Sequence, residues 1–288
     1  MTPPVDQQWM KASFERAAGS YAESAALQRE VEARLLERLD LMSLVPDRVL
    51  DLGCGLGNST NALAARYPDA EVIGVDLAFP MLATGQHRGW RVCADAATLP
   101  LADTSCDLLF SNLMLQWAPS LPTMLDSFRG VLRSQGLLLF STFGPDTLME
   151  LRHAWSESDG EVHVNDFADM HQIGDILVEA GYVDPVMDVE RITVTYPDVM
   201  TLMRDLKAIG AHNVDSRRRR TLTGKRRLRR MIEVYESEFR MDDGRLPATY
   251  EVIYGHALGP PPGQPRRREG VEEATFSIDH LRGSRRRR

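Results

Sequence analysis

The sequence predicts an α/β fold with an open, mostly parallel sheet, helices on both faces and an antiparallel last strand. Strand-length apolar runs alternate with helical stretches: strands are expected at 47–52, 71–76, 91–94, 106–112 and 136–143, and helices at 58–67, 78–86 and 121–133. This alternation is typical of a parallel sheet. A turn with almost no side-chain bulk, GCGLG at 53–57, directly follows the first strand. With 288 residues, the chain has room for one large domain with added helices.

Helical patterns flank this core. Residues 8–42 read as one or two helices, and further helices are expected at 145–156 and 168–180. A sixth strand is expected at 185–196 and a seventh only from Thr249, so the segment between them is an insertion. The predicted organisation is therefore N-terminal lid helices at 1–45, a core at 46–196, a helical lid insertion at 197–247, the last core strand at 248–259, and a flexible Arg-rich tail at 260–288.

Composition narrows the cellular setting. No apolar run approaches the ~20 residues that a membrane span needs, and the N-terminus lacks the basic flank and apolar core of a signal peptide. The three cysteines form no CxxC pair. They are expected to be free thiols of a cytoplasmic protein. The histidines at 153, 163 and 171 lack HExxH spacing, so no metal site is predicted.

Charge is unevenly distributed along the chain. Residues 217–230, RRRRTLTGKRRLRR, hold nine basic residues and no acid, although the whole chain carries a net charge of −7. A basic island on an acidic protein indicates an acidic partner, while a solvated surface is the plainer interpretation.

The glycine turn indicates a ligand site. In VLDLGCGLG at 49–57, Asp51 ends the strand and Gly53, Gly55 and Gly57 leave the backbone bare, so a ligand can approach the amides at a helix N-terminus. Such a turn serves several adenosine ligands. Asp76 ends the second strand about twenty residues later, where an acid can bind both ribose hydroxyls.

Several stretches together carry a family resemblance. The ordered set DLGCGLG, VDLAFPML, CADAATLPLADTSCDLLFSNL and LRSQGLLLFSTF resembles class I S-adenosylmethionine-dependent methyltransferases, which have a Rossmann-like sheet. Outside this core, FERAAGSYAESAALQREV, STFGPDTLMELRHAW, LMRDLKAIGAHN and GRLPATYEVIYGHA closely resemble the malonyl-[acyl-carrier protein] O-methyltransferases of biotin synthesis. The similarity covers roughly residues 12–260. Leu56 stands where many members carry proline.

The resemblance implies a binding site for S-adenosyl-L-methionine, which leaves as S-adenosylhomocysteine. The glycines would line its methionine part near Asp51, Asp76 would hold the ribose, and Asp95 with its neighbour Ala96 would meet the adenine amino group. Leu77 and Met81 would pack against the adenine, and Ser111 and Asn112 would lie beneath the sulfonium. For Asp51, capping of the following turn is the plainer alternative.

The implied reaction methylates the free carboxylate of a malonyl thioester. A carboxylate is already ionised at neutral pH, so no general base is needed, and the protein supplies alignment and excludes water. Tyr21 and Arg16 belong to the family's lid, and Tyr21 is equally well explained as core. Arg204 and Lys207, with Arg152 behind them, are candidate partners of the malonyl carboxylate. The segment 217–230 is expected to dock the carrier protein, with no role for nucleic acid or membrane.

Two other functions stay open at this stage. One is a methyltransferase of a small free carboxylic acid such as trans-aconitate, which would need no surface for a carrier. The other is an assembly factor that keeps the methyltransferase fold but works by contacting another protein, although the lack of a transit peptide counts against it.

Overall fold

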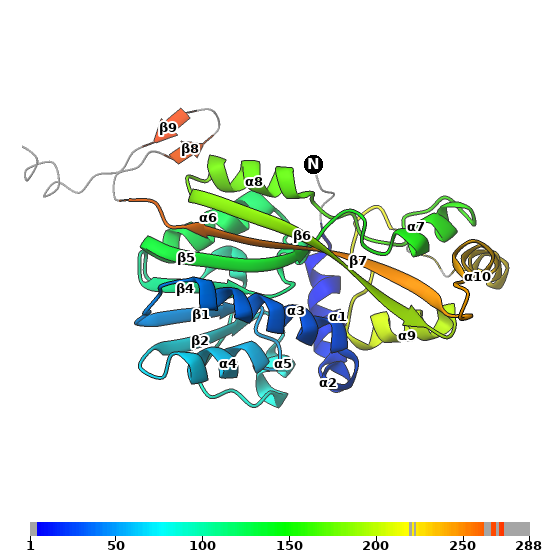
Figure 1. Cartoon of the computed structure of the whole chain (residues 1–288), viewed down its shortest axis with the longest axis horizontal. Helices are drawn as coiled ribbons and strands as arrows, with labels where there is room; N and C mark the ends of the chain where they lie inside the picture. The colour runs from blue at the N-terminus through cyan, green and yellow to red at the C-terminus, as the bar shows by residue number, and fades with distance from the viewer. Residues whose placement is uncertain (1–4, 219–220, 222, 262–265, 269–270, 274–288) are drawn as a thin grey trace, which may run out of the picture.

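The computed structural model describes residues 5–218, 221, 223–261, 266–268 and 271–273. Its centre is one seven-stranded sheet in the order β3-β2-β1-β4-β5-β7-β6 (Figure 1). The strands are β1 (Arg48–Leu52), β2 (Glu71–Asp76), β3 (Trp90–Cys93), β4 (Cys106–Ser111), β5 (Leu132–Phe143), β6 (Val183–Tyr196) and β7 (Leu246–Leu258). The first five strands run parallel, and β7 is antiparallel to both of its neighbours. The predicted fold class is confirmed.

Helices cover both faces of the sheet and form the N-terminal segment. Their bounds are α1 (Gln7–Ala17), α2 (Tyr21–Ser24), α3 (Ala26–Glu37), α4 (Asn58–Arg66), α5 (Phe79–Thr84), α6 (Leu121–Val131), α7 (Met149–Ser156), α8 (Met170–Glu179), α9 (Val199–Ala208) and α10 (Lys225–Phe239), with 3₁₀ turns η1 (Arg38–Leu41), η2 (Ala96–Thr98) and η3 (Leu115–Trp117). One buried cluster joins the sheet to α6 and α8, and another joins it to α3 and α4. Burial of these apolar faces on the strands holds the layers together.

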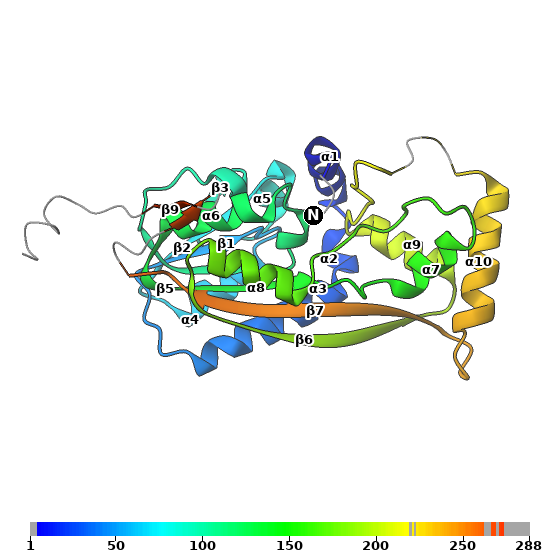
Figure 2. The same cartoon turned by 90° about the horizontal axis from the view of Figure 1, so that it is seen from above.

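The last two strands extend well beyond the rest of the sheet. β7 pairs with β5 only as far as Val252 opposite Phe143, while its pairing with β6 continues to Leu246 opposite Tyr196. A separate buried cluster packs α7, α9 and α10 against this extension (Figures 1 and 2). The insertion between β6 and β7 therefore has its own apolar support, centred on the fully buried Tyr235.

Several element ends differ from the sequence-based expectations. The N-terminal segment forms three α-helices, β5 begins at Leu132, and β7 begins at Leu246. Residues 132–135, which precede the strand expected from 136, therefore belong to β5, and Gln135 takes a left-handed φ of 61° there. Within the predicted tail, β8 (Arg266–Arg268) and β9 (Val271–Glu273) form an antiparallel pair. The rest of that tail, at 262–265, 269–270 and 274–288, lies outside the described residues.

Candidate active site

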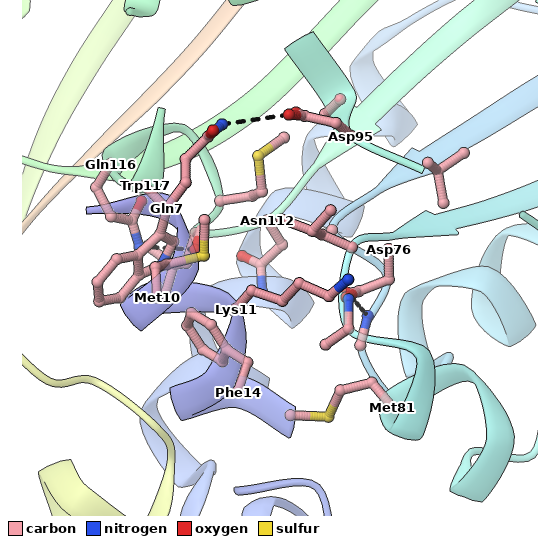
Figure 3. Close-up of a pocket in the computed structure, with 18 of the residues that line it drawn as sticks. Gln7, Met10, Lys11, Phe14, Asp76, Met81, Asp95, Asn112, Gln116 and Trp117 are labelled. Atoms are coloured by element: carbon pink, nitrogen blue, oxygen red, sulfur yellow. Dashed lines mark hydrogen bonds between the residues drawn. The ribbon is translucent and has the colours of Figure 1, made fainter. Parts of the chain in front are cut away.

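A pocket lies at the carboxyl ends of the parallel strands, beneath α1 (Figure 3). This is where open α/β sheets bind ligands. Nine of the sequence-predicted residues line it: Tyr21, Gly53, Gly55, Asp76, Leu77, Met81, Asp95, Ala96 and Asn112. The remaining predicted residues lie elsewhere, as described below.

The glycine turn takes the bare conformation that its sequence predicts. Gly53, Gly55 and Gly57 have φ angles of 73°, 52° and 86°, in the region where side chains are strained. A Cβ added at Gly55 would meet no protein atom within 4 Å, so Gly55 faces open pocket space. A Cβ at Gly57 would instead lie 2.3 Å from the His87 ring. Gly55 therefore leaves room for a ligand, and Gly57 leaves room for packing.

Asp76 connects the glycine turn to the pocket. One carboxylate oxygen accepts from the Gly55 amide at 2.9 Å, and the other accepts from the Ala78 amide at 2.8 Å. Burial raises the pKa of Asp76, and these amides oppose the shift. Each oxygen retains a second lone pair. Asp76 can therefore still accept hydrogen bonds from a diol in the pocket.

Asp51 and Ser111 are buried behind the pocket wall. The Asp51 carboxylate accepts from the Ser59 hydroxyl at 2.7 Å and from the Thr60 hydroxyl at 2.5 Å, so it ties the end of β1 to the first turn of α4. This geometry matches the capping interpretation of Asp51. Ser111 is fully buried, and its hydroxyl has no hydrogen-bond partner among the described residues.

Behind the pocket wall lie two acids, the buried Asp51 and the partly exposed Glu32. Burial raises the pKa of Asp51 to about 6 and that of Glu32, on α3, to about 7, and each shift also contains repulsion from a neighbouring acid. Burial and repulsion from Asp76 and Glu32 raise the pKa of Tyr21 as well. The motif-based prediction missed Glu32, because it lies in the N-terminal helices, far from the glycine turn in the sequence. A cluster of this kind favours a cationic ligand.

Helix α1 closes the pocket with one face. Gln7, Met10, Lys11 and Phe14 line it, at the spacing that places residues on one side of a helix. The Gln7 amide donates to the Asp95 carboxylate at 3.2 Å across the pocket, and Figure 3 shows Lys11 pointing toward Asp76. The sequence-based prediction included none of these four side chains in the site. Their spacing was the signal that could have found them.

The segment after β4 forms the floor of the pocket. The Asn112 amide donates to the Gln28 carbonyl at 3.1 Å, and its oxygen accepts from the Ser141 hydroxyl at 2.7 Å. The next residue, Leu113, has a φ of 48°, an uncommon value for a branched side chain. Strained backbone of this kind concentrates at functional sites. Trp117, from η3, adds an aromatic wall against Phe14.

The predicted carboxylate partners do not line this pocket. Arg204 and Lys207 lie with Arg16 in a separate groove on the other side of α1. Arg152 donates to the backbone carbonyls of Pro145, Thr147 and Asn165, which gives it a structural role. The basic residue that does line the pocket is Lys11, alone of its kind among the described residues.

The basic segment 217–230 divides into parts with different surroundings. Arg217 pairs with Asp215 and Asp166, and Arg218 pairs with Asp6. Residues 219, 220 and 222 lie outside the described residues. The remaining basic residues belong to α10, at the end of the molecule away from the pocket (Figure 2).

In the part of the chain that the structure places, no three His, Cys, Asp or Glu side chains gather as a metal site would require. No helix within these ranges has the length and apolar character of a membrane span.

Comparison with known proteins identifies the family. Residues 50–140 match the family model described as a methyltransferase domain. A malonyl-[acyl-carrier protein] O-methyltransferase of Gallionella capsiferriformans is 48% identical over 95% of this chain and 98% of its own length. The chain belongs to the malonyl-[acyl-carrier protein] O-methyltransferase family. A second member, from Methylovorus sp., is 50% identical over 89% of this chain and 90% of its own.

Solved structures of other proteins share the fold of this methyltransferase. The YcgJ protein of Bacillus subtilis gives a TM-score of 0.58 at 14% identity, covering 81% of this chain and 99% of its own. Phosphoethanolamine N-methyltransferase 2 of Haemonchus contortus, in complex with S-adenosyl-L-methionine, gives 0.52 at 16% identity, covering 86% of this chain and 57% of its own. At these identities, the likeness concerns the fold alone.

Proposed function

We propose that this methyltransferase transfers the methyl group of S-adenosyl-L-methionine to the free carboxylate of a malonyl thioester carried by acyl carrier protein. The single observation that carries the proposal is near-full-length similarity to relatives that bear this activity in their names. We also assign the reaction to the cytoplasm, which is consistent with the free cysteines at 54, 93 and 106.

The pocket residues fit the methyl donor. Gly55 offers bare backbone, Asp76 offers free lone pairs beside it, and Met81 and Leu77 offer apolar surface for a base. Glu32 and Asp51 supply negative potential behind the wall, which suits a sulfonium and an ammonium group. In this assignment, Asp95 meets the adenine amino group once Gln7 releases its carboxylate.

The proposed methyl transfer needs no general acid or base. A carboxylate oxygen of the malonyl group forms the new bond to the methyl carbon while the carbon–sulfur bond breaks and its electron pair stays on sulfur. Because the nucleophile is already ionised, the chain's task is to orient it and to keep water out. Phe14, Met10 and Trp117 provide the apolar cover for this.

We assign the malonyl carboxylate to Lys11. A carboxylate entering a closed pocket needs a cationic or hydrogen-bonding partner, and Lys11 is the basic side chain on the pocket wall (Figure 3). Its existing contact with Glu15 is long, at 3.9 Å, and partly exposed. The Trp117 indole N–H, on the same pocket wall, is a second candidate donor.

Substrate comparison tests the proposal. Initial rates with malonyl-carrier protein should exceed those with free malonate and trans-aconitate at equal concentration. Faster turnover of a free acid would indicate the small-acid methyltransferase instead. Rescue of a biotin auxotroph that lacks this step tests the assembly-factor alternative: failure of rescue by a folded protein that binds S-adenosylmethionine would favour that alternative.

A further inference from the structure

A second depression lies on the opposite side of α1 from the active-site pocket. Along two segments of the chain, some residues line this groove and their neighbours line the pocket. α1 gives Met10 and Phe14 to the pocket, and it gives Trp9 and Arg16 to the groove. Residues 207–212 divide in the same way: Ile209 and Ala211 line the pocket, and Lys207 and His212 line the groove. The groove and the pocket are therefore separated only by α1 and the segment 207–212.

This groove is basic. Arg16, Arg204 and Lys207 line it, and no acidic side chain does so among the described residues. Their hydrogen bonds go to neutral groups: Arg16 to the Ser13 hydroxyl, and Arg204 to the Met200 carbonyl and the Thr201 hydroxyl. By contrast, Arg217 and Arg218 nearby are paired with acids. None of the three forms a close ion pair within the part of the chain that the structure describes, although Arg204 lies near enough to Asp198 to lower the pKa of that carboxyl. On a chain with a net charge of −7, such a group of cations is conspicuous.

An aromatic side chain stands among these cations. Trp9 is 37% exposed, and guanidinium groups lie over its ring at 4.8 Å from Arg16 and 5.7 Å from Arg218. His212, edge-on to the same ring, has its pKa lowered by burial and then by Arg16 and Lys207, as expected where positive potential accumulates. Exposed tryptophan beside arginine is the composition of an interaction hot spot.

We propose that this groove, defined by Trp9, Arg16, Arg204 and Lys207, docks the acidic surface of the acyl carrier protein. The inference rests on the proposed function and assigns the carrier-binding role to these residues. Charge complementarity selects the occupant, because the three cations need an anionic partner and carrier proteins are small and acidic. Location agrees, since a carrier seated here stands directly behind the pocket wall. Its flexible phosphopantetheine arm would pass the edge of α1 to reach Lys11.

The competing surface is α10. Lys225, Arg226 and Arg230 are exposed there, but the helix lies at the far end of the molecule, beyond α9 (Figure 2). A carrier bound on α10 would stand away from the pocket, with α9 between them. Reversing three charges on each surface changes the net charge equally, so each variant serves as the matched control for the other.

The test compares two triple charge reversals, Arg16→Glu/Arg204→Glu/Lys207→Glu and Lys225→Glu/Arg226→Glu/Arg230→Glu. The Michaelis constant for malonyl-carrier protein and the rate on a short malonyl-thioester mimic are measured at low and high salt. The groove variant should raise the Michaelis constant on the order of tenfold at low salt, and this difference should shrink as salt screens the charges. The rate on the mimic should not change, and the α10 variant should resemble wild type.

Two results would overturn the proposal: an unchanged Michaelis constant in the groove variant, or an equal loss on carrier and mimic, which would indicate damage to the pocket. If the triple variant does not fold, the double variant Arg204→Glu/Lys207→Glu replaces it, because it changes only exposed residues of α9. The same two results for its Michaelis constant would overturn the proposal. Absence of turnover by wild type on both substrates would instead contradict the proposed function.

Discussion

At the scale of single residues, Asp76 links the glycine turn to the pocket. Replacing it with alanine removes the carboxylate that faces the pocket and also two hydrogen bonds to backbone amides. Hydrogen bonds to a charged group contribute roughly 1.5–3 kcal/mol each. We expect Asp76→Ala to weaken S-adenosylmethionine binding at least about tenfold in calorimetry.

The control for this variant is its thermal unfolding. A midpoint close to that of wild type, together with weaker binding, supports the assignment. A dissociation constant equal to that of wild type would remove Asp76 from the binding site.

Lys11 carries the second residue-scale prediction. Lys11→Met keeps most of the apolar stem but removes the charge, so the Michaelis constant for the malonyl substrate should rise about tenfold, the size of one charge-assisted hydrogen bond. The affinity for S-adenosylmethionine should change little, and Lys11→Arg should restore part of the lost affinity for malonyl substrate. An unaltered Michaelis constant in Lys11→Met would transfer the role to another donor, with the Trp117 indole as the next candidate.

At the scale of elements, acids from α3, β1 and β2 share one region behind the pocket. The pKa of Glu32 is raised to about 7 and that of Asp51 to about 6, so both bind protons as the pH falls through this range. A cationic ligand favours the ionised forms and lowers these pKa values, so binding releases protons. Affinity for S-adenosylmethionine should therefore increase as the pH rises from below 6 to above 7.

Calorimetry in buffers of different ionisation enthalpy measures this proton release directly. Glu32→Gln should flatten the upper part of the pH profile, and S-adenosylhomocysteine, which lacks the sulfonium charge, should show a weaker dependence. With both substrates saturating, turnover should show no rising limb near neutral pH, because the nucleophile needs no general base. A flat affinity profile across this range would show that these acids do not sense the ligand.

Elements also show how far the sequence could predict the structure. The alternating apolar runs were sufficient to predict the parallel sheet. The glycines and Asp76 were sufficient to predict one side of the pocket. The pocket residues of α1 were harder to predict. Gln7, Met10 and Lys11 lie on a short helix, and nothing in its sequence marks the face that meets the pocket. Local periodicity cannot tell which face meets the pocket, since that depends on packing between distant segments.

The insertion illustrates the same limit. The segment after α9 lines the pocket through Ile209 and Ala211, whereas β6 and β7 continue beyond the sheet and provide a second apolar support for α10. Arg204 and Lys207 therefore face away from the pocket, although their position in the sequence suggested the opposite. The length of a strand pair beyond its neighbours is set by tertiary packing, which no motif in this chain encodes.

At the scale of the whole molecule, the pocket and the basic groove lie on opposite sides of α1. The strand ends and α1 enclose a pocket with bare backbone and one lysine, further acids lie behind its wall, and the basic groove lies on the other side of α1. A carrier-bound substrate needs both a binding site for the small group and a surface for the protein that delivers it. Under the proposed function, the helices outside the methyltransferase core supply both.

The most direct test is the intact mass of the carrier after reaction. Malonyl-carrier protein is incubated with the enzyme and S-adenosylmethionine, and the mass of the acyl group is measured. We expect the malonyl group to gain the mass of one methyl substitution, and esterase treatment to reverse the gain. A malonyl-carrier mass that stays unchanged, with enzyme that binds S-adenosylmethionine normally, would contradict the account.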